Sequence, residues 1–533
     1  MDEDAAGGGN EPQQHASYGA VTKKANMLAK SPTVGGSIIA NPDRDDRQEL
    51  LSHEQRISTP MGETPDQILN SLGPFNPYIL MVFTLMAIIW AVAAMPVMTS
   101  AWLVGNVCSE NVTNCVTTPG SVVEEFNLTG KEARYGDMTT MAFLIGNAIG
   151  GSIINRFSDL KGRRTALLFA LACYGLFGIA GSFSRNVWQL MALRLFQGML
   201  FPGCGVINWV LAYESSPMAL RKYTPLIFGL CWVIGYTLLA PIAYFFPHWR
   251  AILVAASLPS LISAAVLFFV LPDSFHWLVN EEREEDVQRW LNAANRFARR
   301  PRLDLNAATI IRDHHKTKNS KPEASKRGII SELMQRRVLL IYTVILSYLW
   351  TVDSFVYYGL SLFSTELAGN KFMNYILSGL VEVPSYLFSP FLLNYLGRRL
   401  FVSGGHFLTA AAFIGLMFVS NPTLSLILWL IGKFAISCCF TSLFVYASEL
   451  FPTSLRNGCM GVAVFMAKYT INLVGSIFAP FTRTLADIWI LLPALTFALL
   501  SGVGGLATLV LKETKGCELP DTSSEIGEDD ERR

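Results

Sequence analysis

Residues 78–102 read YILMVFTLMAIIWAVAAMPVMTSAW and contain no charged side chain. A helix needs about 20 apolar residues to cross a bilayer, so this stretch alone predicts a membrane span. Leu253–Leu271 and Ile488–Leu511 reach a similar length, also without a charge. The composition agrees, because 51% of the 533 residues are hydrophobic and 16% are charged, whereas about a quarter are charged in soluble chains. The sequence therefore predicts an all-α membrane protein.

Twelve apolar stretches are predicted to cross the membrane, and a hydrophilic segment after the sixth divides them into two six-helix, pseudo-symmetric halves. The predicted spans lie near 78–102, 137–156, 165–183, 188–212, 224–246, 251–271, 338–363, 373–396, 401–420, 423–447, 458–481 and 488–511. The predicted domains are a disordered tail (1–75), a first bundle (76–272) with a short outer loop (103–136), a linker with amphipathic helices (273–337), a second bundle (338–512) and an acidic tail (513–533).

Lys and Arg are concentrated in alternate loops. Arg163 and Arg164 follow the second span, and Arg398 and Arg399 follow the eighth, whereas the intervening loops contain few basic residues. Short cytoplasmic loops carry an excess of Lys and Arg, so we expect these loops and both termini to be cytoplasmic.

The loop after the first span is then expected to lie outside. It contains the sequons Asn111-Val-Thr and Asn127-Leu-Thr, which predict two glycosylated asparagines. Cys108 and Cys115 lie in the same loop, where an oxidising compartment would allow a disulfide between them.

Two short sequences occupy matching places in the two halves. NRFSDLKGRR at 155–164 follows the second span, and NYLGRR at 394–399 follows the eighth. This repetition indicates duplication of a six-span unit, an arrangement in which a central site forms between two halves that rock against each other.

The first of these sequences resembles the major facilitator superfamily signature G-x-x-x-D-x-x-G-R-R, with Asn155 in place of the leading glycine. The resemblance implies that Gly162 permits a tight turn and that Asp159 is an ion partner that holds neighbouring helices in the outward-open state. The predicted conformational latch consists of Asp159, Gly162, Arg163, Arg164, Glu449 and Arg456.

More specific strings resemble organic cation, anion and carnitine transporters (solute carrier family 22), and are nearest to the carnitine/zwitterion branch. The strings are GYTLLA at 235–240, PHWR at 247–250, LPDSFHWL at 271–278, YYGLSL at 357–362, LVEVP at 380–384, GKF at 432–434, YASELFPTSLR at 446–456 and ETKGCELPDT at 513–522. The resemblance covers about residues 75–522, but the outer loop is shorter and poorer in cysteine than is usual in the family.

Four charged residues inside predicted spans are candidates for the substrate site, namely Asp353, Glu382, Lys433 and Lys468. A charge at the bilayer centre costs about 2.5–3.5 kcal/mol on insertion scales, so each needs a partner, water or a functional role. The two acids and two bases can pair with each other when the site is empty, or can meet a charged substrate group.

Lys468 lies twelve residues beyond Arg456. In the family that this chain resembles, carriers of organic cations have an acid at that position, whereas anion carriers and the carnitine branch have a basic residue. Lys468 therefore argues against a simple cation carrier and suits a carboxylate-bearing anion or zwitterion. The structural alternative is that Lys468 extends to the membrane surface or forms an ion pair.

Aromatic residues in the fourth, fifth, seventh and tenth spans are predicted to line the cavity. A quaternary ammonium group binds aromatic faces at about 0.5–2 kcal/mol each, although a single aromatic residue in a span is more often a packing residue. The candidates are Trp209, Trp232, Tyr236, Trp350, Tyr357, Tyr358, Phe440 and Phe444.

The sequence thus predicts a carrier of small organic ions that works by alternating access. The favoured substrate is a zwitterion or carboxylate such as a carnitine-like betaine, and the alternative is a polyspecific organic anion or organic cation transporter. A transport-inactive receptor or scaffold is the alternative from another class. No P-loop, nucleophile elbow or metal-ligand cluster is found, so we expect no enzyme activity, cofactor or metal.

The expected partners are the small organic ion, the lipid bilayer and a coupling ion, for which Na⁺ and H⁺ both stay open. The tail sequences around Tyr18 and Asp46–Leu51 have the spacing of trafficking signals, which adaptors would read. A formal net charge of +1 gives no reason to expect a nucleic acid partner. We expect the plasma membrane, with an endolysosomal membrane as the alternative.

Overall fold

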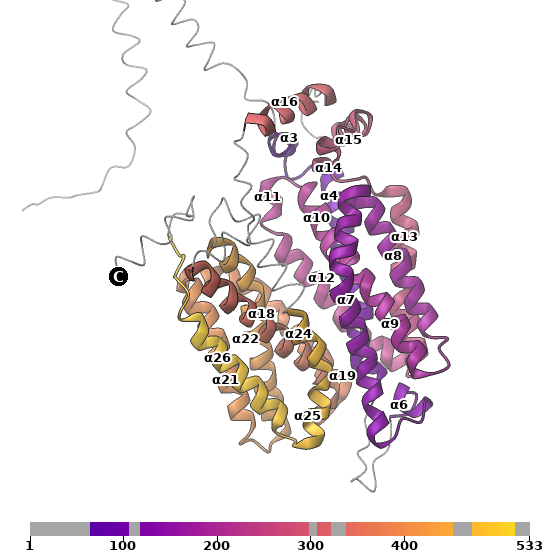
Figure 1. Ribbon diagram of the computed structural model, residues 1–533, viewed down its shortest axis with the longest axis vertical. Helices are drawn as coiled ribbons and strands as arrows, with labels where there is room; N and C mark the ends of the chain where they lie inside the picture. The colour runs from indigo at the N-terminus through magenta and orange to yellow at the C-terminus, as the bar shows by residue number, and fades with distance from the viewer. Residues whose placement is uncertain (1–63, 106–117, 298–305, 321–336, 451–471, 517–533) are drawn as a thin grey trace, which may run out of the picture. The chain divides into compact units, whose positions relative to one another are not determined.

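The computed structural model describes residues 64–105, 118–297, 306–320, 337–450 and 472–516, and all regular secondary structure in these ranges is helical. Ten spans among the described residues are long and apolar enough to cross a membrane, and Leu492–Thr508 is a shorter apolar helix. Figure 1 shows two groups of helices, one indigo to magenta and the other orange to yellow.

The first bundle is built from the helices before the linker. They are α4 (Pro77–Met98) with α5 (Ser100–Leu103), α7 (Arg134–Lys161), α8 (Arg163–Gly181), α9 (Val187–Pro202) with η2 (Gly203–Ile207) and α10 (Asn208–Glu214), α12 (Thr224–Phe245) and α13 (Trp249–Val270).

The second bundle follows the linker. It contains α18 (Arg337–Phe363) with η3 (Ser364–Glu366), α19 (Lys371–Leu380) with α20 (Glu382–Leu396), α21 (Arg398–Leu416), α22 (Pro422–Leu450), α24 (Asn472–Phe478) with η5 (Ala479–Phe481) and α25 (Thr482–Ile488), and α26 (Leu492–Thr508).

Helices α7 and α9 pack closely because glycine lies at their contact. A Cβ atom at Gly146 would lie 2.0 Å from the Leu195 carbonyl oxygen, and one at Gly150 would lie 1.9 Å from that of Met199. Small residues at this i, i+4 spacing let transmembrane backbones approach each other, so these positions admit no larger side chain.

The eighth predicted span is divided at Val381 into α19 and α20. Pro384 occupies the third position of α20 and has no N–H to donate to the carbonyl of Leu380, so helical hydrogen bonding is interrupted here. The division places Glu382 in the first turn of α20, where the helix dipole favours a carboxylate.

The end of the bundles that carries Arg163 and Arg398 is called the motif end below, and the opposite end is called the far end. Short helices lie at both (Figure 1). At the motif end are α3 (Pro65–Leu72), α11 (Met218–Arg221), α14 (Phe275–Asn280), α15 (Glu284–Arg296) and α16 (Ala307–Ser320), and at the far end are α6 (Val122–Glu125) and η1 (Gly130–Ala133).

Helix α3 lies inside the segment predicted to be a disordered tail, so the structure differs from that prediction at residues 64–75. Thr64 and Gln67 form a reciprocal capping box, which satisfies backbone donors at the helix start. Asp66 Oδ1 lies 2.6 Å from Arg221 Nη2, which ties α3 to α11.

Candidate functional site

Lys433 and Glu382 form an ion pair inside the second bundle, and both residues are fully buried. Lys433 Nζ lies 3.0 Å from Glu382 Oε1 and donates a hydrogen bond of 2.6 Å to Ser361 Oγ. It also donates to the Tyr357 carbonyl at 3.3 Å and lies 3.3 Å from the centroid of the Tyr357 ring. These contacts offset the cost of removing the ammonium from water.

A hydrogen-bonded chain joins this ion pair to the first bundle. Trp232 on α12 donates its indole N–H to Tyr357 Oη at 2.8 Å. Tyr357 on α18 in turn donates to Glu382 Oε2 at 3.1 Å. The hydrogen-bonded chain therefore runs from one half of the molecule into the other.

Aromatic rings surround the ion pair. Tyr358 meets Tyr357 edge-on at 5.3 Å between centroids, and Phe440 stacks on Tyr357 at 5.8 Å. On the first-bundle side, Trp209 and Trp232 both pack on Trp90, at 5.8 and 6.0 Å. Their faces are of the kind that bind cations, and the substrate-binding role of these rings stays a prediction.

The other predicted aromatic residues lie beside this group. Tyr236 on α12 stacks face to face on Tyr375 of α19, with centroids 4.4 Å apart. Phe444 packs against Phe440 at 5.8 Å and against Trp350 at 5.7 Å. Trp350 and Phe444 are thus joined to the site through Phe440, although Phe444 is 39% exposed.

The four charged residues predicted from the sequence do not form one group. Asp353 is buried on α18 with its carboxylate 3.6 Å from His406 Nε2. Lys468 lies outside the described residues. The structure therefore brings together Glu382 and Lys433 and places Asp353 at a separate position.

The repeated sequences at the motif end form matching contacts, of which the first involves Arg163. Its guanidinium donates to Asp159 Oδ1 at 2.7 Å and to Glu214 Oε2 at 3.2 Å. Gly162 has a positive φ of 96°, and a Cβ there would lie 2.3 Å from Asp273 Oδ2. Asp273 accepts from the Arg164 N–H, and its pKa is raised because burial outweighs its hydrogen bonds.

The second half repeats this arrangement with different residues. Arg398 donates to Glu449 Oε2 at 2.8 Å. Gly397 has a φ of 89°, and Glu513 accepts from the backbone of Arg398 and Arg399 at 2.8 and 3.0 Å. Burial alone would raise the pKa of Glu513, but these backbone donors hold it below its ordinary value.

The position equivalent to Asp159, four residues before the arginine, is Asn394 in the second half. Arg163 contacts an aspartate four residues before it, whereas Arg398 has no acid at the matching position. Both halves keep the contact to the carboxylate at the end of the fourth or tenth span, which is Glu214 or Glu449.

The far end holds a further charged group that joins the two halves. Arg483 Nη1 lies 3.7 Å from Asp137 Oδ1 on α7, and Nη2 lies 3.2 Å from Glu366 Oε1. Thr365 Oγ1 donates to the Ala101 carbonyl at 3.1 Å. These contacts hold the ends of α5, α7, η3 and α25 together.

A buried arginine, Arg194 on α9, was not among the predicted site residues. It donates to the Pro96 carbonyl at 3.0 Å and to Ser100 Oγ at 2.7 Å, and lies 4.6 Å from the centroid of the Phe143 ring. A charged residue inside the fourth predicted span is the feature of the sequence that could have identified Arg194. His406, inside the ninth span, carried a comparable signal.

Other site residues that sequence reasoning missed are Ser361, Tyr375 and Arg483. Ser361 follows Tyr357 by one helical turn, so the i, i+4 spacing in YYGLSL could have identified it. Arg483 follows the eleventh predicted span directly, and only the three-dimensional contact with α7 shows its role.

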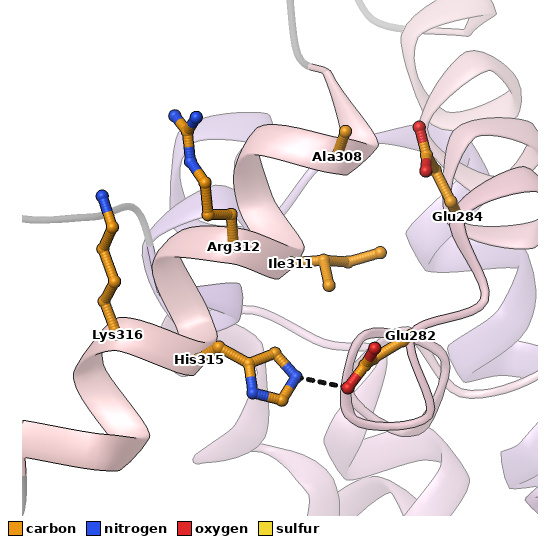
Figure 2. Close-up of a pocket in the computed structure, with 7 residues that line it drawn as sticks. All are labelled: Glu282, Glu284, Ala308, Ile311, Arg312, His315 and Lys316. Atoms are coloured by element: carbon orange, nitrogen blue, oxygen red, sulfur yellow. Dashed lines mark ion pairs between the residues drawn. The ribbon is translucent and has the colours of Figure 1, made fainter.

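An open cleft of about 530 Å³ lies in the linker. Figure 2 shows Glu282 and Glu284 on one side and Arg312, His315 and Lys316 on the other. His315 Nε2 lies 2.7 Å from Glu282 Oε1, so the contact ties α16 to the turn after α14.

The remaining predicted residues are not placed in the site. Asn127 is exposed after α6 with a φ of 50°, a conformation that asparagine tolerates, so a glycan would have access to it. Several predictions lie outside the described residues: those for Asn111, Cys108, Cys115, Arg456, Lys468 and the tail sequences around Tyr18 and Asp46–Leu51.

Comparison with known proteins identifies the family. Residues 91–524 match the family described as "Sugar (and other) transporter". A protein of Caenorhabditis elegans named as a transporter is 32% identical over 89% of this chain and 93% of its own length. The human organic cation/carnitine transporter 2 is 30% identical over 76% of this chain and 72% of its own length.

Solved structures of transporters have the same fold as this chain. The Escherichia coli xylose transporter XylE in an inward-open conformation superposes with a TM-score of 0.61 over 83% of this chain and 98% of XylE, at 16% identity. These relatives are carriers and not enzymes. The chain therefore belongs to the sugar (and other) transporter family, as a multi-pass membrane transporter with the major facilitator fold that is related to the organic cation/carnitine transporters of solute carrier family 22.

Proposed function

We propose that this transporter carries small zwitterions, with a carnitine-like betaine as the best representative, by alternating access between the two halves. The Lys433–Glu382 ion pair carries this proposal. A zwitterion can replace the pair charge for charge, with its carboxylate on Lys433 and its ammonium beside Glu382 and the aromatic rings. No charge is then left without a partner in the buried site.

A substrate with one charge does not have this advantage. A simple cation would pair with Glu382 and leave the Lys433 ammonium buried without its acid. A simple anion would pair with Lys433 and leave the Glu382 carboxylate buried without its base. Breaking a buried pair in this way costs roughly 3–5 kcal/mol. The name of the human relative, which includes organic cations and carnitine, is compatible with this class of substrate.

Lys468 is proposed as a second partner for the substrate carboxylate, on the basis of its position in the sequence. We also propose that the motif end faces the cytoplasm, that the far end and Asn127 face the outside, and that the protein acts at the plasma membrane. The excess of Lys and Arg in the motif-end loops supports this orientation. Transport then requires the contacts of Arg483 to break in each cycle.

Uptake by the purified full-length protein in proteoliposomes tests the proposal. Three radiolabelled probes of similar size would be compared, with and without Na⁺: L-carnitine, a tetraalkylammonium ion and a monocarboxylate. We expect the betaine to enter several-fold faster than either of the others. Preferred uptake of a singly charged probe would contradict the zwitterion assignment, and uptake of none would favour the receptor or scaffold alternative.

A further inference from the structure

A second buried pair of ionisable groups lies inside the second bundle, away from the ion pair of the proposed site. Asp353 on α18 and His406 on α21 are both 0% exposed, and Oδ1 lies 3.6 Å from Nε2. That separation is longer than a hydrogen bond. Neither the Asp353 carboxylate nor the His406 ring has a hydrogen-bond partner among the described residues.

Among the described residues, the surroundings of this pair contain little other charge. Cys439 on α22 lies within electrostatic range of Asp353. On α26 the backbone approaches the ring, since a Cβ at Gly504 would lie 3.3 Å from His406 Nδ1. The described residues of α26 and α24 contain no ionisable side chain. The other buried charges on these helices, Lys433 of α22 and its partner Glu382, neutralise each other.

A low-dielectric site of this kind favours zero net charge. The pair is neutral when it holds one proton, either as carboxylic acid with neutral imidazole or as carboxylate with imidazolium. Losing that proton leaves a buried negative charge, and gaining a second leaves a buried positive charge, and both are costly. The proton can therefore leave only when the site becomes hydrated.

The pair also has a direct connection to the proposed substrate site. Asp353 and Tyr357 are one turn apart on α18, and the carbonyl and hydroxyl of Tyr357 contact Lys433 and Glu382. We propose that Asp353 and His406 together form a binding site for one proton, and that release of this proton to water in one conformation couples H⁺ movement to substrate movement. The coupling part of this proposal rests on the proposed function, whereas the proton site does not.

Infrared difference spectroscopy of the purified full-length protein tests the proton site without any substrate. In the hydrated conformation the pair exchanges its proton with the buffer, so spectra in mildly acidic and mildly alkaline buffer should differ in carboxyl and imidazole bands that both Asp353→Asn and His406→Asn remove. Two control variants should keep these bands. Asp286→Asn alters a half-buried acid, and His248→Gln alters an exposed histidine. If the parent shows no such bands, the proton site is wrong, whatever the variants do.

Uptake of L-carnitine into proteoliposomes with an imposed pH gradient, at zero membrane potential, tests the coupling. We expect the gradient to stimulate the parent and both control variants several-fold. It should leave Asp353→Asn and His406→Asn unstimulated at their residual rate. Uptake by the parent that ignores the gradient would overturn the coupling and leave the proposed function standing. Absence of uptake at any pH would instead overturn the proposed function, while the infrared bands still decide the proton site.

Discussion

Lys433 shows how a membrane interior accommodates an ammonium group. The side chain donates hydrogen bonds to a hydroxyl and a backbone carbonyl, and it has an acid and an aromatic face within reach of its charge. The sequence could show that a charge lies in this span, and it could suggest that acids and bases pair. It could not show that Lys433 takes Glu382 rather than Asp353, because the choice depends on how α18, α20 and α22 are rotated.

The first prediction concerns this ion pair. Glu382→Gln or Lys433→Met alone should destabilise the protein by roughly 3–5 kcal/mol, because each leaves one buried charge without its partner. The double variant should recover most of the thermal stability, yet transport no L-carnitine. Thermal unfolding in detergent and proteoliposome uptake measure the two effects. A double variant as unstable as the sum of the single variants would contradict the pairing.

The second prediction concerns the turn glycines. Gly162→Ala and Gly397→Ala should each lower the free energy of unfolding by about 1–3 kcal/mol, because both residues have backbone angles that are almost restricted to glycine. The added Cβ would also displace Asp273 or Glu513. Gly404→Ala is the matched control, since α21 is helical there and nothing lies within 4 Å of the new methyl group. A melting temperature of Gly404→Ala below that of Gly162→Ala or Gly397→Ala would refute this account.

At the scale of elements, apolar length located the ten spans found among the described residues, but it could not locate the breaks within them. Most of the eleventh predicted span, 458–481, lies outside the described residues. The divided eighth span follows from Pro384, which the sequence displays, yet the position of Glu382 in the first turn of α20 needed the structure. The composition of the tail predicts disorder, whereas the capping box of α3 and the burial of Ile68, Leu69 and Leu72 stabilise a helix there. Arg483 lies outside the predicted spans, so its charge gives no sign in the sequence of a buried contact.

The third prediction concerns α6 and its attachment to α13. Arg250 Nη2 lies 2.6 Å from Glu125 Oε1, and the hydrogen bonds from Arg250 lower the pKa of Glu125. Stabilisation by a carboxylate with a lowered pKa is present above its unfolded pKa and is lost as the pH falls through the folded pKa. Glu125→Gln should therefore melt below the parent at neutral pH, and the difference should shrink toward zero in acid. A difference that grows in acid would contradict the sign.

At the scale of the whole molecule, duplication of a six-span unit and the family resemblance predicted the architecture. The two bundles meet through Trp232 and Tyr357 near the ion pair and through Arg483 at the far end. The first of these contacts involves residues chosen from the sequence as aromatic candidates. The second could not be predicted, because Asp137, Glu366 and Arg483 lie far apart in the chain and their contact depends on how the two halves meet.

The fourth prediction concerns this far-end contact. Arg483→Gln removes both ion pairs, so the conformation in which the far end is open should become more populated. A Thr140→Cys reporter, buried on α7, should then react several-fold faster with a membrane-impermeant maleimide added outside cells. Arg185→Gln, an exposed far-end arginine, is the matched control. Equal labelling in Arg483→Gln and in the control would show that Arg483 does not hold the halves together.

The matching carboxylates at the motif end, Asp273 and Glu513, affect the order in which the two halves can fold during synthesis. Asp273 bonds to the start of α8 from 109 residues later in the sequence, and Glu513 bonds to the start of α21 from 115 residues later. The N–H groups that begin the third and ninth spans therefore lack these acceptors until the residue that directly follows the same half has been synthesised. The first half can accordingly form its contact to Asp273 before the second half has been synthesised.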